Sequence, residues 1–89
     1  MGIDAVIFGA SGYGGGELLY WLSRHPEVRR VRGTSRTLDG KPFSTAHPNL
    51  RSVVDGRFES EIDWQELASS AQVVVFSALP QDFIEHHLF

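Results

Sequence analysis

The stretch AVIFGASGYGGGELL, residues 5–19, predicts the fold of this chain. Its first four residues are apolar, which suits a short strand buried on both faces in a parallel sheet. A cluster of glycines follows, and from Gly15 on the small and apolar residues recur with the spacing of one helical face. Pro26 predicts the end of this helix, because proline lacks the N–H that a helix interior needs.

The rest of the chain continues to alternate between strand and helix patterns. We expect, in order, a strand over 28–34, an irregular excursion over 37–57 with a short strand near Val53 or Phe58, a helix from the capping box of Asp63 and Glu66 to about Ser69, a strand over 73–78, and a helix over 81–89 that follows Pro80. This order predicts an α/β fold: a doubly wound parallel sheet (Rossmann-like), truncated to its N-terminal strands and helices. A complete fold of this type has about six strands. We therefore expect that these residues form the front part of a larger protein.

The composition excludes several classes of protein. The 89 residues include 8 Lys+Arg, 11 Asp+Glu and no cysteine, and 42% of them are hydrophobic. These values are not typical of a disordered chain or of a polybasic protein that binds nucleic acid. Without cysteine, these residues cannot form disulfides, thiolate metal sites or a thiol nucleophile. No apolar run approaches the roughly 18 residues of a membrane helix, and no basic segment precedes the first run, so we expect a cytoplasmic protein.

Three glycines with the spacing Gly-x-x-Gly-x-x-Gly separate the first strand from the helix. Gly9 would allow the tight turn, Gly12 the close approach of a pyrophosphate, and Gly15 the close packing of helix on sheet. The helix start would add N–H donors and a partial positive charge. The alternative is a flexible loop without a ligand. We disfavour it because each glycine at the helix start costs about 1 kcal/mol relative to alanine.

The residues after the second strand indicate which dinucleotide binds. An NAD-specific site places an acidic residue about 20 positions after the last glycine, on the ribose hydroxyls. Ser35 and Arg36 stand there instead, and a hydroxyl with a guanidinium suits the 2′-phosphate of NADP. Residues 24–41 carry a net charge of +4, against −7 for the remainder. We interpret the other arginines of the second strand as a solvated strand edge: Arg29, Arg30 and Arg32.

The histidines predict no metal site. His86 and His87 are adjacent, so on a helix their side chains diverge and do not chelate. His25 lies at a predicted helix end, where the helix dipole favours a cation. Two interpretations of His47 remain open. It shapes the mouth of the cofactor or substrate cleft, or it hydrogen-bonds the backbone around Pro48.

Six segments of the chain together resemble one enzyme family. They are GASGYGGGELL (9–19), HPEV (25–28), TSR (34–36), GKP (40–42), HPNL (47–50) and VVVFSALP (73–80). In this combination the chain resembles the N-acetyl-γ-glutamyl-phosphate reductases, and also their relatives in lysine biosynthesis whose substrate is linked to a carrier protein. The resemblance implies an NADP-dependent enzyme of arginine biosynthesis that reduces N-acetyl-γ-glutamyl phosphate to N-acetylglutamate semialdehyde. Such enzymes carry their cysteine and histidine in a later domain. Residues 1–89 would then be the N-terminal part of the NAD(P)-binding domain, with no catalytic residue.

The resemblance also implies where the cofactor binds. Gly14 stands where the family usually has Thr or Ala, and Gln81 stands where many members have His. The expected NADP-binding residues are Gly9, Ser11, Gly12, Tyr13, Gly14, Gly15, Ser35, Arg36, Ala78, Leu79 and Pro80. We expect the full-length enzyme to take a small acyl phosphate and to form a homo-oligomer, without nucleic-acid or membrane partners. The alternatives are the carrier-linked reductase of lysine biosynthesis and a non-catalytic dinucleotide-binding module.

Overall fold

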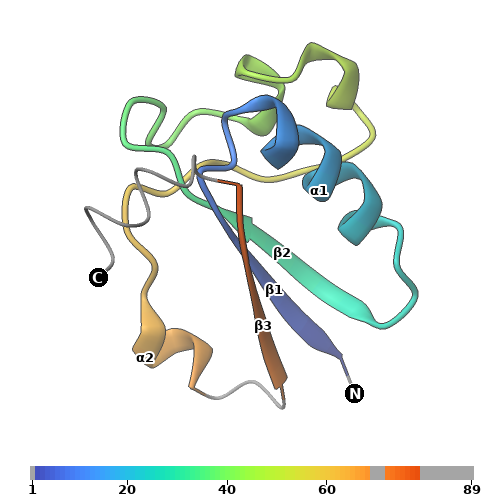
Figure 1. Ribbon diagram of the computed structural model, residues 1–89, viewed down its shortest axis with the longest axis vertical. Coiled ribbons are helices and arrows are strands. Elements are labelled where there is room, and N and C mark those ends of the chain that lie inside the picture. Colours follow the sequence, from blue (N-terminus) through green and yellow to red (C-terminus); the bar gives the residue numbers. More distant parts are fainter. Residues whose placement is uncertain (1, 69–71, 79–89) are drawn as a thin grey trace.

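A parallel sheet of three strands forms the centre of the structure (Figure 1), a computed structural model that describes residues 2–68 and 72–78. The strands are β1 (Ile3–Phe8), β2 (Val28–Gly33) and β3 (Gln72–Ser77). Their order is β2-β1-β3, and β1 is parallel to both neighbours. The predicted parallel α/β sheet is therefore confirmed. The helix predicted over 81–89 lies outside the described residues.

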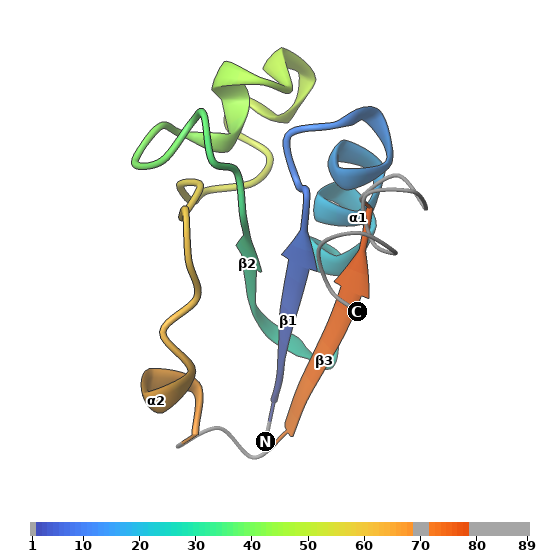
Figure 2. The same ribbon diagram turned by 60° about the vertical axis from the view of Figure 1, so that its left-hand side comes forward.

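Helix α1 (Tyr13–Ser23) covers one face of the sheet (Figure 2). It begins two residues earlier than the leucine spacing predicted and ends before Pro26. Its buried residues are Gly15 and Leu19, and Leu19 packs with Ile7 of β1 in the larger apolar core. Within the described part of the chain, no helix has both the length and the apolar character needed to cross a membrane.

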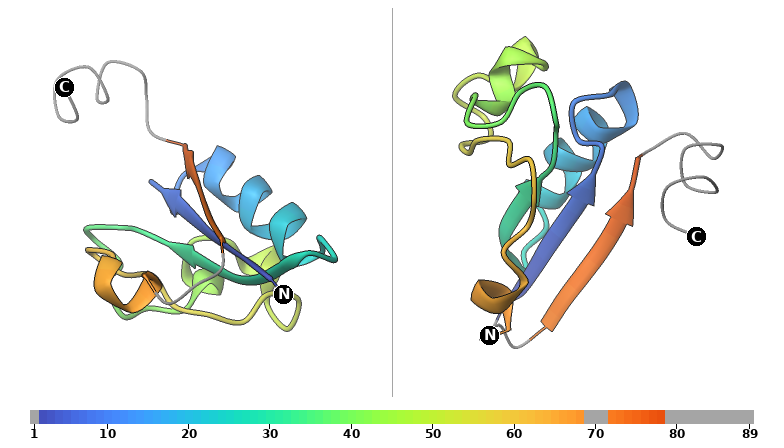
Figure 3. Two further views of the ribbon diagram at one scale, coloured as in Figure 1. Left: turned by 90° about the horizontal axis from the view of Figure 1, so that it is seen from below. Right: turned by 90° about the vertical axis from the view of Figure 1, so that its left-hand side faces the viewer.

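The opposite face of the sheet is covered by α2 (Trp64–Leu67) and the residues before it (Figure 3). Ile62 and Leu67 pack against Val6, whose side chain points away from that of Ile7, as alternation along a strand requires. Asp63 caps α2, because its Oδ1 accepts a hydrogen bond from the Glu66 N–H at 3.1 Å. The predicted cap is thus confirmed, but the helix spans one turn only.

The excursion between β2 and α2 contributes much of the core. It contains two 3₁₀ turns, η1 (Phe43–Thr45) and η2 (Pro48–Leu50). Phe43, Leu50 and Phe58 are at most 1% exposed, and all three belong to the same apolar core as α1. These long-range contacts give residues 37–57 a defined path that the sequence pattern did not predict.

The short strand expected near Val53 or Phe58 is reduced to two isolated bridges, one between Arg57 and Pro42 and one between Glu59 and Thr34, the residue that follows β2. The Ser35 N–H donates to the Glu59 carbonyl at 2.9 Å, and the Glu59 N–H donates to the Gly33 carbonyl at 3.0 Å. This segment runs parallel to β2 on the side away from β1. Val53 lies in a turn, so the expectation was wrong for Val53 and correct only in placing an extended segment next to Phe58.

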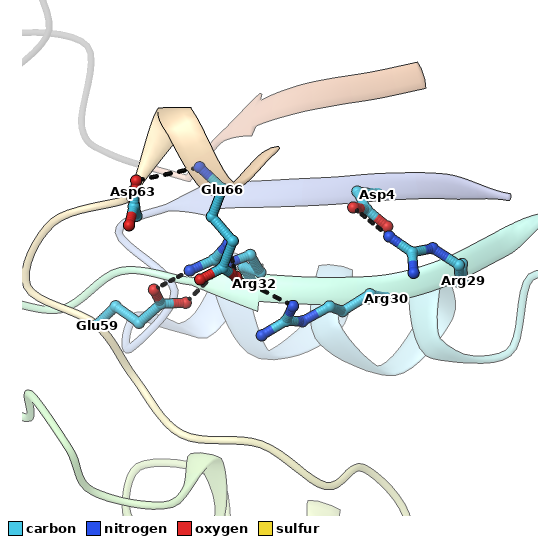
Figure 4. Close-up of polar contacts among 7 residues, drawn as sticks. All are labelled: Asp4, Arg29, Arg30, Arg32, Glu59, Asp63 and Glu66. Atoms are coloured by element: carbon cyan, nitrogen blue, oxygen red, sulfur yellow. Dashed lines mark hydrogen bonds and ion pairs between the residues drawn. The ribbon is translucent and has the colours of Figure 1, made fainter. Parts of the chain in front are cut away.

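The arginines of β2 differ from the predicted solvated edge (Figure 4). The Arg32 side chain is only 5% exposed and binds both oxygens of Glu59, with the Nε–Oε2 distance at 2.9 Å. Its Nη1 also lies 2.9 Å from Oε1 of Glu66, the atom that the exposed Arg30 contacts at 3.2 Å. The prediction was therefore wrong for Arg32. The hydrogen bonds that Arg32 donates to Glu59 raise the pKa of its guanidinium against the opposing effect of burial.

A further ion pair joins β1 to β2 near the start of both strands. Asp4 of β1 is 1% exposed, and its Oδ2 accepts a hydrogen bond from Nη2 of the exposed Arg29 at 2.8 Å. A buried carboxylate requires such a partner, because removing a charge from water costs several kcal/mol. Arg29 thus has a structural role in addition to being exposed.

We predict that Arg32→Met destabilises the fold and that Arg30→Met does not. Arg32→Met leaves the half-buried Glu59 without its partner and should lower the free energy of unfolding by about 2–4 kcal/mol. Arg30 contacts the same Glu66 from an exposed position, so its loss should cost at most about 1 kcal/mol. Urea unfolding followed by tryptophan fluorescence measures both. Equal effects would show that the burial of Arg32 is unimportant.

Candidate dinucleotide-binding site

The predicted cofactor residues gather at one edge of the sheet, where the parallel strands end (Figure 2). The glycine turn leaves β1 at this edge, Ser35 and Arg36 follow β2, and Ala78 follows β3. The Ala78 N–H donates to the Phe8 carbonyl at 2.9 Å, which extends the pairing of β3 with β1 by one residue. Ligands of open α/β sheets bind at this edge. Two further predicted residues, Leu79 and Pro80, lie outside the described residues.

Gly9 makes the turn away from β1 in a conformation that suits glycine. Its φ is +73°, a region that side chains with a Cβ rarely adopt. Its N–H donates to Oγ1 of Thr34 at 3.1 Å, which ties the turn to the end of β2. The prediction that Gly9 permits the tight turn is consistent with this geometry. The Thr34 contact was not predicted, because it joins residues 25 positions apart.

Gly15 allows α1 to pack directly on the glycine turn. A Cβ at Gly15 would lie 2.5 Å from both Cα and O of Ala10, closer than real Cβ contacts allow. Ala10 is itself fully buried, and its N–H donates to the Thr34 carbonyl at 2.9 Å. Gly15 therefore makes the close packing that was predicted, but the contact is with Ala10 of the glycine turn rather than with a strand of the sheet.

The start of α1 has the features of an anion-binding site. Gly12 is the N-cap residue, and among the described residues no side chain caps the first turn. Among the described residues, a Cβ at Gly12 would have the Gly9 oxygen as its nearest neighbour, at 3.8 Å. Tyr13 is 88% exposed. Uncapped N–H groups and the positive end of the helix dipole fit a phosphate at this position.

Ser35 and Arg36 have different surroundings at the end of β2. Ser35 is buried, and its Oγ accepts a hydrogen bond from the Leu38 N–H at 3.2 Å. The hydroxyl thus stabilises the 35–38 turn, a role that the sequence analysis missed. A serine three residues before the N–H it binds is the signal that could have revealed it. Arg36 is exposed on this turn.

His47 contacts the glycine turn itself. Its Nε2 lies 2.7 Å from the Ala10 oxygen, and the side chain is buried. The expected backbone contact therefore exists, but at Ala10 rather than around Pro48. The structure also explains Gly16, which the motif did not include, because a Cβ there would lie 2.6 Å from Nδ1 of His47.

A cavity of about 370 Å³ lies elsewhere, along β2 and residues 53–57. Several arginines line it, including Arg29, Arg30, Arg32 and Arg57. These guanidinium groups already bind protein acceptors, as Arg57 does with the Gly40 carbonyl at 2.8 Å. The strand-end edge, which carries the uncapped helix start, is the stronger candidate for a dinucleotide.

The parallel sheet, the glycine turn and the uncapped helix start define a nucleotide-binding domain of the doubly wound α/β class. Comparison with known families makes the assignment specific. The family described as "Semialdehyde dehydrogenase, NAD binding domain" matches residues 4–88. The chain belongs to this family, whose members bind a nicotinamide dinucleotide.

Similar proteins of known name support the resemblance found in the sequence. The chain is 52% identical over 75 residues to the N-acetyl-γ-glutamyl-phosphate reductase of Methanopyrus kandleri, covering 83% of this chain and 22% of the relative. It is 49% identical over 78 residues to the enzyme of the same name from Methanothrix thermoacetophila, covering 88% and 22%. It is 44% identical over 78 residues to a [LysW]-L-2-aminoadipate/[LysW]-L-glutamate phosphate reductase of Sulfolobus acidocaldarius, again covering 88% and 22%. The chain thus spans about a fifth of the length of these relatives.

We predict that alanine is excluded at Gly15 and tolerated at Gly14. The Gly15→Ala methyl collides with the Ala10 backbone and should destabilise the fold by about 2 kcal/mol or more. A Cβ at Gly14 lies 3.9 Å from that of Ala78, an ordinary contact. Gly14→Ala should therefore be neutral or stabilising by up to about 1 kcal/mol. Urea midpoints compare the two, and a tolerated Gly15→Ala would contradict the close packing described above.

Proposed function

We propose that this chain is the dinucleotide-binding part of an NADP-dependent acyl-phosphate reductase, which converts N-acetyl-γ-glutamyl phosphate to N-acetylglutamate semialdehyde in arginine biosynthesis. The uncapped, glycine-lined start of α1 carries the proposal, because it offers N–H donors to an anion at the edge where the strands end. The relatives of this name, at 49–52% identity, support the choice of reaction.

The proposed roles of these residues concern binding and orientation. Tyr13 and Gly14 would direct their N–H groups at the pyrophosphate, and Gly12, whose own N–H donates to the Gly9 oxygen, would allow its close approach. Ala78 would border the same space from the end of β3, because the Gly14 backbone lies close to it. When bound, the nicotinamide supplies the hydride. We propose no catalytic residue within this chain, since it contains no cysteine to form a thioester.

The preference for NADP is proposed from the end of β2. No carboxylate follows this strand directly: Ser35 and Arg36 occupy the positions after Thr34. The nearest acidic residue downstream, Asp39, accepts a hydrogen bond from the Ser60 N–H at 2.9 Å. An exposed guanidinium can bind two oxygens of a 2′-phosphate. NAD has no 2′-phosphate, so the same guanidinium should contribute little to the binding of NAD.

A carrier-linked reductase of lysine biosynthesis is the second candidate. The 44% identity to the Sulfolobus acidocaldarius protein favours it. The two candidates differ in substrate, so the full-length protein should be assayed for phosphate-dependent reduction of NADP with free N-acetylglutamate semialdehyde and with carrier-bound semialdehyde. Activity with the free compound alone supports the arginine pathway. Activity with neither would count against both reductase assignments and leave the non-catalytic dinucleotide-binding module.

Two further parts of the proposal concern the whole protein. We propose that it is a cytoplasmic homo-oligomer that acts on a small molecule. One observation favours further contacts beyond the described residues: β3 has exposed apolar surface, with Val75 49% exposed. In a complete doubly wound sheet, additional strands and helices cover such surface.

We predict that Arg36→Leu weakens NADP binding selectively. Charge-assisted hydrogen bonds to a phosphate contribute about 1.5–3 kcal/mol, so the dissociation constant for NADP should rise about 10- to 150-fold. That for NAD should barely change, and the effect should shrink as salt screens the exposed pair. Titration of the full-length protein with both dinucleotides at two salt concentrations measures this.

Arg24→Leu is the matched control for net charge. Arg24 is exposed at the opposite end of α1, where its guanidinium lies 5.3 Å from the Tyr20 ring centroid. This variant should bind NADP as the wild type does. Equal weakening of NADP and NAD by Arg36→Leu would assign Arg36 a structural role only. A wild type that prefers NAD would contradict the proposed role of Ser35 and Arg36.

A further inference from the structure

His47 lies between the two 3₁₀ turns of the excursion, and backbone hydrogen bonds hold it on both sides. Its N–H donates to the Phe43 carbonyl at 3.0 Å, and its carbonyl accepts from the Leu50 N–H at 2.9 Å. Phe43 and Leu50 are both buried in the apolar core. The backbone that carries the imidazole is therefore fixed on both sides, and the ring is 6.3 Å from that of Phe58, centroid to centroid.

The imidazole contacts the glycine turn and the helix start at the same time. Its Nε2 is 2.7 Å from the Ala10 oxygen, and it must donate because a carbonyl oxygen only accepts. The other side of the ring lies against Gly16, where a Cβ would be 2.6 Å from Nδ1 and 2.7 Å from Cε1. His47 thus touches the backbone on both sides of the residues that would bind the pyrophosphate.

The residues between these two contacts need an external constraint. Residues 9–16 include five glycines, which lose more conformational freedom on ordering than any other residue type. No side chain among the described residues caps the start of α1. Within the turn, the Gly12 N–H donates to the Gly9 oxygen at 3.3 Å, which is long for such a bond.

From this geometry we infer that His47 is a positioning residue for the dinucleotide: by holding the Ala10 carbonyl and packing on Gly16, it fixes the direction of the N–H groups of Tyr13 and Gly14. The identity of the ligand in this inference rests on the proposed function. The ordering of the glycine turn rests on the contacts of His47 alone. An N–H array that is already ordered binds an anion more tightly, because the cost of ordering is not incurred on binding.

The test compares four variants of the full-length protein by titration with NADPH and by thermal unfolding. His47→Phe keeps an aromatic ring and removes the donor, so the dissociation constant should rise about 5- to 50-fold. His47→Gln places an amide N–H where Nε2 was and should bind within about 3-fold of the wild type. Gly16→Ala should weaken binding as His47→Phe does, because its methyl displaces the ring. Asn49→Ala, exposed in η2, should bind as the wild type does.

Amide hydrogen exchange of the ligand-free protein separates this inference from the proposed function. In His47→Phe, exchange should accelerate at Gly12 and Gly16 and stay unchanged in β1. If NADPH does not bind the wild type but this local acceleration occurs, the cofactor assignment fails and the positioning of the turn stands. Wild-type exchange and binding in His47→Phe would overturn the inference. So would a uniform acceleration in all elements with no rescue by His47→Gln, because that pattern indicates general destabilisation.

Discussion

A single residue, Ala10, contacts three other segments of the chain. Its N–H donates to Thr34 at the end of β2, its oxygen accepts from His47, and its backbone occupies the space that a Cβ of Gly15 would need. Its own Cβ lies where a side chain at Gly33 would be, 2.6 Å away. Because the contact with Gly15 is made by the Ala10 backbone, which cannot move aside as a flexible side chain can, the position of α1 on the sheet depends on this close approach.

The excursion after β2 pairs with the sheet and fills part of the apolar core, as strands and helices do in the rest of the fold. Residues 57–60 extend the sheet for a single bridge only, and the bond between Glu59 and the buried Arg32 reinforces it. The 3₁₀ turns fill the core beside α1 with Phe43 and Leu50, and they carry His47 to the glycine turn. The path of this irregular segment is defined because its apolar side chains are buried in the core.

The contacts also divide the molecule into a supporting end and a binding end. Near the start of β2 lies the pair of Asp4 and Arg29, and along its length the contacts of Arg32 hold α2 and Glu59 to the sheet. At the other end, no side chain among the described residues caps the start of α1, and Arg36 is exposed. This separation suits a domain that binds a dinucleotide at one end of its sheet.

The unit of strand, glycine turn and helix, the parallel sheet and the cap at Asp63 could be predicted from the sequence, since each depends on a local pattern of residues. The sequence also predicted the tasks of Gly9 and Gly15, because both follow from the absence of a Cβ. The burial of Arg32 and the contact of His47 with Ala10 could be seen only in the tertiary structure. These contacts join residues 27 and 37 positions apart. A charged or polar side chain can be buried only where another element brings its partner, and no local pattern contains that information.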